Sequence, residues 1–344
     1  MAMWLISVPA WGTRYIALAT RLTLPSLAAA LARTALPHLV VIHTDDAAAF
    51  GPYPSGLNVE FREPSDAAGY AKYYLAHQEV VASSRKGEFV SLLPGDCVVS
   101  VEFFVACERR FAQGKKAVAT LGNRTLSSTR PPIGAAARAL MDWSLDNLHP
   151  ISWENIWGSG KTMLPSIVYF MDAQSIVMHS FNYGIVAFAH DGRDMTFKFT
   201  HDHDLPGRFT RAEVHVVTDA DELAIVECSG AAKPFPIQDV TFGVQDVADW
   251  ARAQANSEWN RYFFAQPFVL WGEDSGISRV PVAQILATLD ALQDETPAQI
   301  DERSMRGLRR KIANNERRGA RYSLEEIEDG IAYHVLEARE QGRK

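Results

Sequence analysis

Two aspartates flank a histidine in the middle of the chain, in the run His201-Asp202-His203-Asp204. Carboxylate oxygens and imidazole nitrogens bind divalent cations, and two carboxylates on one face of a strand repel each other unless a cation or an arginine neutralises them. The run follows an apolar segment, 195–199, that predicts a strand turning into a loop. The sequence therefore predicts a metal site with Asp202, His203 and Asp204 as ligands.

Two nearby arginines supply an alternative for the same run. Arg193 and Arg208 lie close enough in the sequence to form structural ion pairs on a turn. An Asp-x-Asp pattern alone is common by chance, so the pattern leaves the metal site and the ion pairs both open.

Other acidic residues follow predicted buried strands. Asp96 comes just after the strand 88–93, where it either approaches a bound sugar nucleotide or its metal, or caps a helix. Asp45 follows the strand 39–43; it is a candidate to bind a uracil or ribose, although a turn into 47–49 is favoured there. No catalytic base is assigned, and Glu102, Asp142 and Glu154 are only available for that role.

One motif with apparent phosphate chemistry is discounted. The segment Gly158-Ser159-Gly160-Lys161-Thr162 resembles the end of a phosphate-binding loop, but Asn155 stands where that loop needs glycine. The preceding residues do not read as a buried strand either, so an ordinary turn is predicted.

The first part of the chain alternates strand and helix patterns. Strands are predicted at 4–8, 39–43, 58–61, 88–93 and 117–121, and helices at 14–32 with a break near Pro25, at 69–84 and at 102–113. This order predicts an α/β fold with a parallel sheet flanked by helices. The segment 8–13 holds one glycine where the dinucleotide fingerprint needs three, which argues against an NAD enzyme.

The pattern changes after residue 130. Short strands predicted at 166–170, 175–178, 184–189, 214–217 and 223–226 indicate a mixed or antiparallel extension, and helical patterns follow at 244–255, 282–292 and in the charged segment 298–344. We expect one domain over 1–235 and a helical C-terminal region over 236–344.

Composition limits the classes of function. The 344 residues are 47% hydrophobic and 22% charged, as in soluble globular proteins, and a net charge of −7 provides no basic field for nucleic acid. No segment reaches the ~18 apolar residues of a membrane span, and the N-terminus does not read as a signal peptide. The three cysteines match no zinc or disulfide pattern, so a cytoplasmic protein is expected; the oligomeric state is not predicted.

Several stretches together resemble bacterial glycosyltransferase-like proteins with a GT-A fold, over roughly residues 3–228. They are Trp11-Gly12-Thr13-Arg14-Tyr15-Ile16, Thr23-Leu24-Pro25-Ser26-Leu27, Leu92-Leu93-Pro94-Gly95-Asp96, and the segments 200–205 and 215–223. The resemblance implies a nucleotide-diphospho-sugar donor, Mn²⁺ or Mg²⁺ as cofactor, and an unknown acceptor. It also implies that the donor binds at Pro9, Trp11, Gly12, Asp45 and Asp96.

The chain departs from that family at one position. A typical member carries Asp-x-Asp at the end of the central strand, whereas this chain has Asp96-Cys97-Val98. Either Asp202 and Asp204 complete the metal site, or the metal site is degenerate. We therefore predict a metal-dependent glycosyltransferase. The alternatives are a metal-dependent phosphoester hydrolase that uses the His-Asp-His-Asp run, and a non-catalytic nucleotide- or sugar-binding protein.

Overall fold

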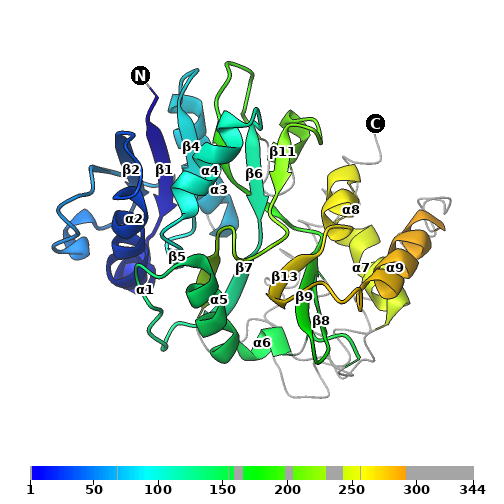
Figure 1. Cartoon of the computed structure of the whole chain (residues 1–344). Coiled ribbons are helices and arrows are strands. Elements are labelled where there is room, and N and C mark those ends of the chain that lie inside the picture. Colours follow the sequence, from blue (N-terminus) through cyan, green and yellow to red (C-terminus); the bar gives the residue numbers. More distant parts are fainter. Residues whose placement is uncertain are drawn as a thin grey trace, which may run out of the picture.

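A computed structural model describes residues 2–67, 69–153, 155–158, 166–197, 204–229, 243–255 and 257–291. A seven-stranded sheet lies at its centre, in the order β11-β6-β10-β4-β1-β2-β3 (Figure 1). Its neighbouring strands are parallel except for β10, which runs antiparallel to both β4 and β6. The strands are β1 Trp4–Pro9, β2 His38–His43, β3 Val59–Arg62, β4 Phe89–Leu92, β6 Ala117–Thr120, β10 Gly184–Ala189 and β11 Val214–Val216.

Helices flank this sheet and confirm the predicted α/β class (Figure 1). The predicted helical stretch 14–32 is one path in three parts, in which a π-helical turn, Ala19–Thr23, separates α1, Gly12–Leu18, from α2, Leu24–Leu31. Pro25 sits in the first turn of α2, directly after the π-helical turn, so the predicted break near Pro25 is a change of helix type within one path. The remaining helices of this part are α3, Gly69–Ser83, and α4, Phe103–Ala112.

The main core packs the helices α1 to α4 against the sheet, and Trp4 of β1 is part of it. Every residue of β1 is buried, as expected for a strand covered on both faces. The Trp4 ring lies 5.2 Å from that of Phe89 and 4.9 Å from that of Phe104. Its indole Nε1–H donates to Glu108 Oε1 at 2.8 Å, so the one polar atom of this ring is satisfied.

A second, three-stranded sheet lies beyond the carboxyl edge of the central one. Its order is β5-β12-β7, with β5 Cys97–Val99, β7 Gly122–Leu126 and β12 Ile225–Ser229. Only residues 93–96 separate β4 from β5, and only Leu121 separates β6 from β7. The chain therefore passes from the central sheet directly into the second sheet at the end where the parallel strands finish. Helix α5, Ala137–Asp146, packs on β7 and β12, and the short α6, Pro150–Trp153, follows it.

A third sheet joins distant parts of the chain, in the order β13-β9-β8. Its strands are β8 Ile167–Met171, β9 Ser175–Ser180 and β13 Phe268–Gly272, and the helices are α7 Val244–Gln254, α8 Glu258–Phe264 and α9 Arg279–Ala291. The rings of Phe181 and Phe264 stack at 3.9 Å within this second apolar cluster. The division at 235/236 stays a prediction, because residues 230–242 lie outside the described ones; β13 nevertheless pairs with β9 across it.

One predicted strand is wrong within the residues that can be checked. Residues 195–197 form no strand, because the Asp194 carboxylate accepts hydrogen bonds from the backbone N–H and the hydroxyl of Thr196 and holds a turn instead. Residues 198–199, the glycine-rich segment 159–162 and the charged segment 298–344 lie outside the described residues.

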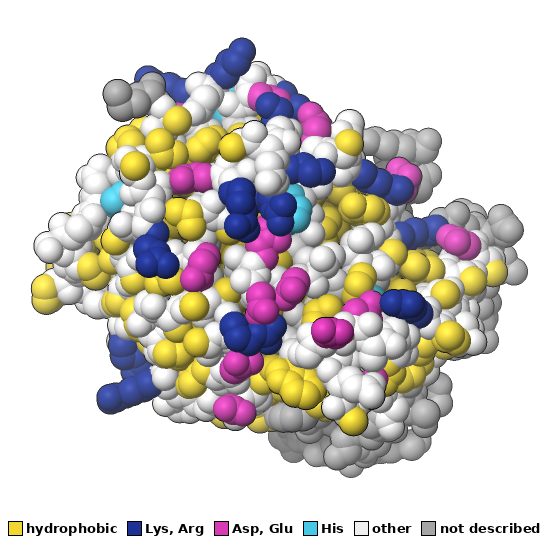
Figure 2. All heavy atoms as spheres, in the orientation of Figure 1, with side chains coloured by type: hydrophobic (Ala, Val, Ile, Leu, Met, Phe, Trp, Pro, Cys, Tyr) yellow, Lys and Arg dark blue, Asp and Glu magenta, His cyan; other side chains and the backbone are white. Residues whose placement is uncertain are grey.

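The surface carries mixed charge. On the face drawn in Figure 2, basic and acidic side chains are interspersed among apolar ones, with no extended basic patch. None of the described helices is long and apolar enough to span a bilayer.

The same substitution should affect the free energy of unfolding differently at a buried and at an exposed valine. Val90 in β4 is 0% exposed, whereas Val280 at the start of α9 is 66% exposed. We expect Val90→Ala to lower the free energy of unfolding by about 2 kcal/mol, because it removes buried methyl groups and leaves a cavity. The same change at Val280 should have an effect within about 0.5 kcal/mol. Urea denaturation measures both, and equal losses would contradict the placement of Val90 in the core.

Candidate functional site

The loops that follow β1, β2 and β4 meet at the carboxyl edge of the central sheet. The backbone N–H of Ala10 donates to the His43 carbonyl at 2.9 Å, which ties the first loop to the second. The N–H of Gly12 then donates to Asp45 Oδ1 at 3.0 Å. In open α/β sheets this edge is where ligands bind, so these loops define the candidate site.

Gly95 brings the third loop against the first. A Cβ at this position would lie 2.6 Å from the Pro9 carbonyl oxygen and 2.8 Å from the Ala10 Cβ, closer than such atoms approach. Only glycine therefore lets the two loops pack together here. The contact fixes the position of the next residue, Asp96, between β4 and β5.

Asp96 is buried in a cluster of charged residues. It is 7% exposed, and its carbonyl accepts from the N–H of Cys228 at 2.8 Å, which joins β5 to β12. Glu227, the neighbour of Cys228 on β12, forms an ion pair with Arg124 of β7 at 3.0 Å. Side chains from two strands of the second sheet, β7 and β12, thus lie close to a side chain from its entry loop.

Burial raises the pKa of the Asp96 carboxyl from 3.8 to about 7, and the negative charge of Glu227 adds to the rise. The charges of Arg124 and Arg14 act in the opposite direction but only partly offset it. Asp96 therefore changes its protonation near neutral pH. Perturbed acids of this kind are concentrated at functional sites.

An aromatic side chain and a cation lie beside the first loop. Trp11 is half-buried at the start of α1, and the Lys72 ammonium of α3 lies 5.2 Å from the centre of its ring. Pro9 is buried at the end of β1, whereas Gly12 and Arg14 are exposed. The predicted residues Pro9, Trp11, Gly12, Asp45 and Asp96 thus all belong to loops or strand ends at one edge.

The structure shows the local backbone geometry at two of the acids, whereas their roles in binding stay predictions. Asp96 does not cap a helix, because β5 follows it and α4 has Glu102 at its N-cap. The favoured turn after Asp45 is confirmed, since Asp46 Oδ1 accepts from the N–H of Ala49 at 3.1 Å and caps the 3₁₀ turn Ala47–Phe50.

The flanks of the His-Asp-His-Asp run lie at the other edge of the sheet. Because β10 is antiparallel, it ends where β4 and β6 begin, and β11 starts beside Ala117 at that same amino edge. Asp204, the one predicted metal ligand among the described residues, precedes the 3₁₀ turn Leu205–Arg208 in this connection. The structure does not bring it into the cluster around Asp96. Asp202 and His203 lie outside the described residues, so the metal site of this run stays a prediction.

Arg193 forms ion pairs beside that run, but the partners that the structure shows for it lie outside the Asp-x-Asp pattern, so the ion-pair alternative also stays a prediction. Arg193 pairs with Asp191 at 2.6 Å and with Glu213 at 2.7 Å, and it donates to the Arg208 carbonyl at 2.8 Å. Hydrogen bonds from Arg193 help lower the pKa of Glu213 to about 2. Arg193 therefore ties the start and the end of the β10–β11 connection together.

Two of the available candidate bases have structural partners. Glu102 Oε2 accepts from the N–H of Ala137 at 3.0 Å and satisfies the start of α5, and Asp142 pairs with Arg138 at 3.5 Å. Glu154 lies outside the described residues.

Sequence reasoning missed Glu227 and Arg124. The signal for Glu227 was a single acid inside the otherwise apolar segment Leu223–Cys228, since a charged residue in a buried strand needs a partner. Arg124 had no comparable signal, because its role depends on the parallel pairing of β7 with β12, 103 residues away. Among the described residues, no group of three or more His, Cys, Asp or Glu side chains forms a ready-made metal site.

Comparison with known proteins leaves the family open. No family model and no curated protein matches the sequence. Among solved structures, the chain is similar to S. aureus TarS, with 13% identity, a TM-score of 0.35, and coverage of 77% of this chain and 42% of that one. For S. aureus TarS 1-349 in complex with UDP-GlcNAc the identity is 19%, the TM-score is 0.27, and 38% of this chain and 37% of that chain are covered.

A putative glucose-1-phosphate thymidylyltransferase from Bacillus anthracis shows 12% identity and a TM-score of 0.25, over 37% of this chain and 56% of that one. The chain thus spans less than three fifths of the length of each of these structures. With TM-scores this low, none of them carries an argument about the site.

The raised pKa of Asp96 predicts a pH-dependent stability. The folded state holds the Asp96 proton up to about pH 7, whereas the unfolded state releases it near pH 4. The free energy of unfolding therefore falls as pH rises between these values, by at most about 1.4 kcal/mol per pH unit for one proton, and levels off above pH 7. Asp96→Asn removes the titrating group, so wild type should lose stability relative to the variant between pH 5 and 7. Chemical denaturation in EDTA measures this difference, and a constant difference across that range would contradict the raised pKa.

Proposed function

We propose that this protein is a glycosyltransferase that binds a nucleotide-diphospho-sugar donor at the carboxyl edge of its central sheet. The observation that carries the proposal is a pair of acids, the buried Asp96 and the half-buried Glu227, which lies beside Arg124 and the loops after β1 and β4. Burying a carboxyl group beside another acid costs free energy, because both effects disfavour its ionised form. A bound cation or a cationic group of a ligand would stabilise the ionised form and reduce this cost.

A divalent cation fits the donor set of this pair. Mg²⁺ uses one or two protein carboxylates and completes its shell with water and substrate phosphates, so Asp96 and Glu227 suffice without a third protein ligand. Bound there, the cation would neutralise the diphosphate as it departs. Glu227 also remains paired with Arg124, which keeps its carboxylate oriented.

The neighbouring loops offer contacts for the rest of the donor. The half-buried ring of Trp11 has a flat apolar surface suited to stacking on a nucleobase or sugar, and the Lys72 ammonium beside it supplies a positive charge that would attract a phosphate. Asp45 holds the Gly12 backbone in place and leaves its second carboxylate oxygen for a ribose hydroxyl.

A non-catalytic binding protein is the second candidate. It is favoured by the single acid in Asp96-Cys97-Val98, which provides one carboxylate where the resembled family has two. The two candidates differ in one measurable product, because only the transferase releases free nucleoside diphosphate from the donor when acceptor or water is present.

Thermal denaturation with UDP-, GDP-, CMP- and dTDP-sugars, with and without Mn²⁺ or Mg²⁺, tests the site. One nucleotide should raise Tm by about 5 °C at 100-fold excess over its Kd, and only with metal present. Asp96→Asn should abolish the shift. Because the amide resembles the protonated carboxyl that Asp96 already carries near neutral pH, this variant is expected to fold.

Two further variants serve as controls. Asp290→Asn changes an exposed acid on α9 that pairs with Arg261, and it should leave the shift intact. The double change Asp202→Ala and Asp204→Ala should also retain it if the cation binds at Asp96. If only that double variant loses the Tm shift, the metal binds in the His-Asp-His-Asp run. If no nucleotide sugar raises the Tm of wild type, the proposal is refuted.

A further inference from the structure

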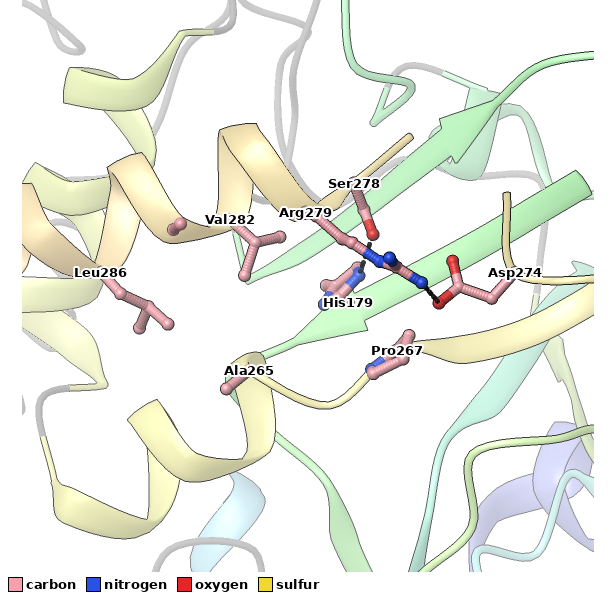
Figure 3. A pocket seen from close by; sticks show the side chains of 9 residues that line it. His179, Ala265, Pro267, Asp274, Ser278, Arg279, Val282 and Leu286 are labelled. Atoms are coloured by element: carbon pink, nitrogen blue, oxygen red, sulfur yellow. Dashed lines mark hydrogen bonds and ion pairs between the residues drawn. The ribbon is translucent and has the colours of Figure 1, made fainter. Parts of the chain in front are cut away.

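A cavity of about 360 Å³ opens between β9, β13 and the N-terminal end of α9 (Figure 3). Its size falls within the range of small-molecule sites. Pro267, Val282 and Leu286 form an apolar wall, and His179 and Ser278 are polar groups on its lining. None of these residues belongs to the carboxyl edge of the central sheet.

Hydrogen bonds fix the proton positions on His179. Its Nδ1 lies 2.8 Å from the Phe264 carbonyl oxygen, which can only accept, so Nδ1 carries the proton. Nε2 is then the acceptor, and the Ser278 hydroxyl, 2.9 Å away, must donate to it. A serine hydroxyl aimed at the lone pair of an oriented imidazole is the arrangement of a nucleophile with its general base.

Burial supports the neutral imidazole. It lowers the pKa of His179 to about 4, although the Phe264 carbonyl and the charge of Asp274 act in the opposite direction. At neutral pH the ring is therefore unprotonated, and its Nε2 lone pair accepts the hydrogen bond from the Ser278 hydroxyl.

The backbone places Ser278 at the start of a helix. The Ser278 carbonyl accepts from the N–H of Val282 at 2.9 Å, so Ser278 occupies the capping position of α9, a 13-residue helix. Its hydroxyl bonds to His179 instead of capping the helix. Negative charge that develops beside Ser278 lies near the positive end of the α9 dipole, which stabilises an oxyanion.

The loop that leads to Ser278 depends on Gly272. This residue has a φ of +74°, and a Cβ there would lie 1.9 Å from the Gln174 carbonyl oxygen. The close approach anchors the end of β13 on β9, the strand that carries His179. Gly276-Ile277-Ser278 also matches the first half of the Gly-x-Ser-x-Gly pattern of serine hydrolases, whereas Val280 stands where the second glycine would be.

We propose that this cavity is a second active site, in which Ser278 is the nucleophile and His179 the general base for hydrolysis of short-chain carboxylic esters. The Ser278 hydroxyl gives its proton to His179 Nε2 while Oγ bonds to the carbonyl carbon. The bond from that carbon to the alcohol oxygen breaks, and the leaving alcohol takes the proton from Nε2. Water then gives a proton to Nε2 and bonds to the acyl carbon, the bond to Oγ breaks, and Oγ recovers the proton.

The cavity restricts the substrate. Ser278 and His179 are each only 2% exposed, so an ester reaches them only through the cavity. The apolar wall of Val282 and Leu286 suits an acyl chain of a few carbons, and the exposed Arg279 lies next to Ser278 on the lining and reaches toward Asp274 (Figure 3). Short acyl groups such as acetyl and butyryl are therefore expected to react faster than long ones.

Covalent labelling of the full chain with a fluorophosphonate probe tests the nucleophile, because attack by Ser278 Oγ displaces fluoride and leaves a stable adduct. Mass spectrometry should map the adduct to Ser278 in wild type. Ser278→Ala should lose it together with hydrolysis of p-nitrophenyl butyrate, and His179→Gln should slow both at least about 100-fold. Ser275→Ala, a serine in the same loop that bonds to Asp172, should retain both.

Labelling of wild type requires no variant to fold, so the proposal stays testable if Ser278→Ala is unstable. An adduct on Ser278 that is absent from denatured protein supports the site. No adduct on wild type, or equal hydrolysis by wild type and a folded Ser278→Ala, overturns it and leaves the Ser278–His179 bond a structural one. Donor binding at Asp96 is measured separately, so either proposal can fail alone.

Discussion

The direction of β10 decides where each later part of this chain lies. Inserted antiparallel between β4 and β6, it carries the chain from the carboxyl edge of the central sheet back to the amino edge. The Ser91 hydroxyl of β4 donates to the Val186 carbonyl of β10 at 2.8 Å, so the pairing is tied by a side chain as well. The β10–β11 connection is thereby removed from the carboxyl edge, and the second sheet occupies that edge instead.

The second sheet places charged side chains beside Asp96, at the end of β4. Asp96 comes from the β4–β5 loop, Glu227 from β12 and Arg124 from β7. Burial and the charge of Glu227 raise the pKa of Asp96, and the charge of Arg124 only partly offsets that rise. Gly95 packs against the Pro9 backbone, so the loop that carries Asp96 lies tightly against the loop after β1. A tight backbone contact and an incompletely balanced charge cluster thus occur at one place, which is a common feature of functional sites.

The cavity beside the third sheet is formed by strand pairing and apolar packing. His179 lies on β9 and Ser278 lies 99 residues later, and the antiparallel pairing of β9 with β13 brings them to hydrogen-bonding distance. The apolar cluster of Phe181, Phe264 and Val282 holds α8 and α9 against that sheet. Packing there fixes the orientation of an imidazole, whereas at the carboxyl edge it raises the pKa of a carboxyl.

Local pattern determined much of the secondary structure and the α/β class. The apolar runs at 4–8 and 39–43 and the helical periodicity of 69–84 depend on side chains a few residues apart, and each formed the predicted element. Asp45 and Asp96 could be chosen as candidate binding residues from the sequence because each follows a predicted strand closely. Strand direction and long-range register carry no local signal, so the sequence did not reveal that β10 is antiparallel, that Asp204 lies at the amino edge, or that Glu227 and Arg124 lie beside Asp96. Only the tertiary structure decided those points, because burial and pairing between distant strands determine which charges meet.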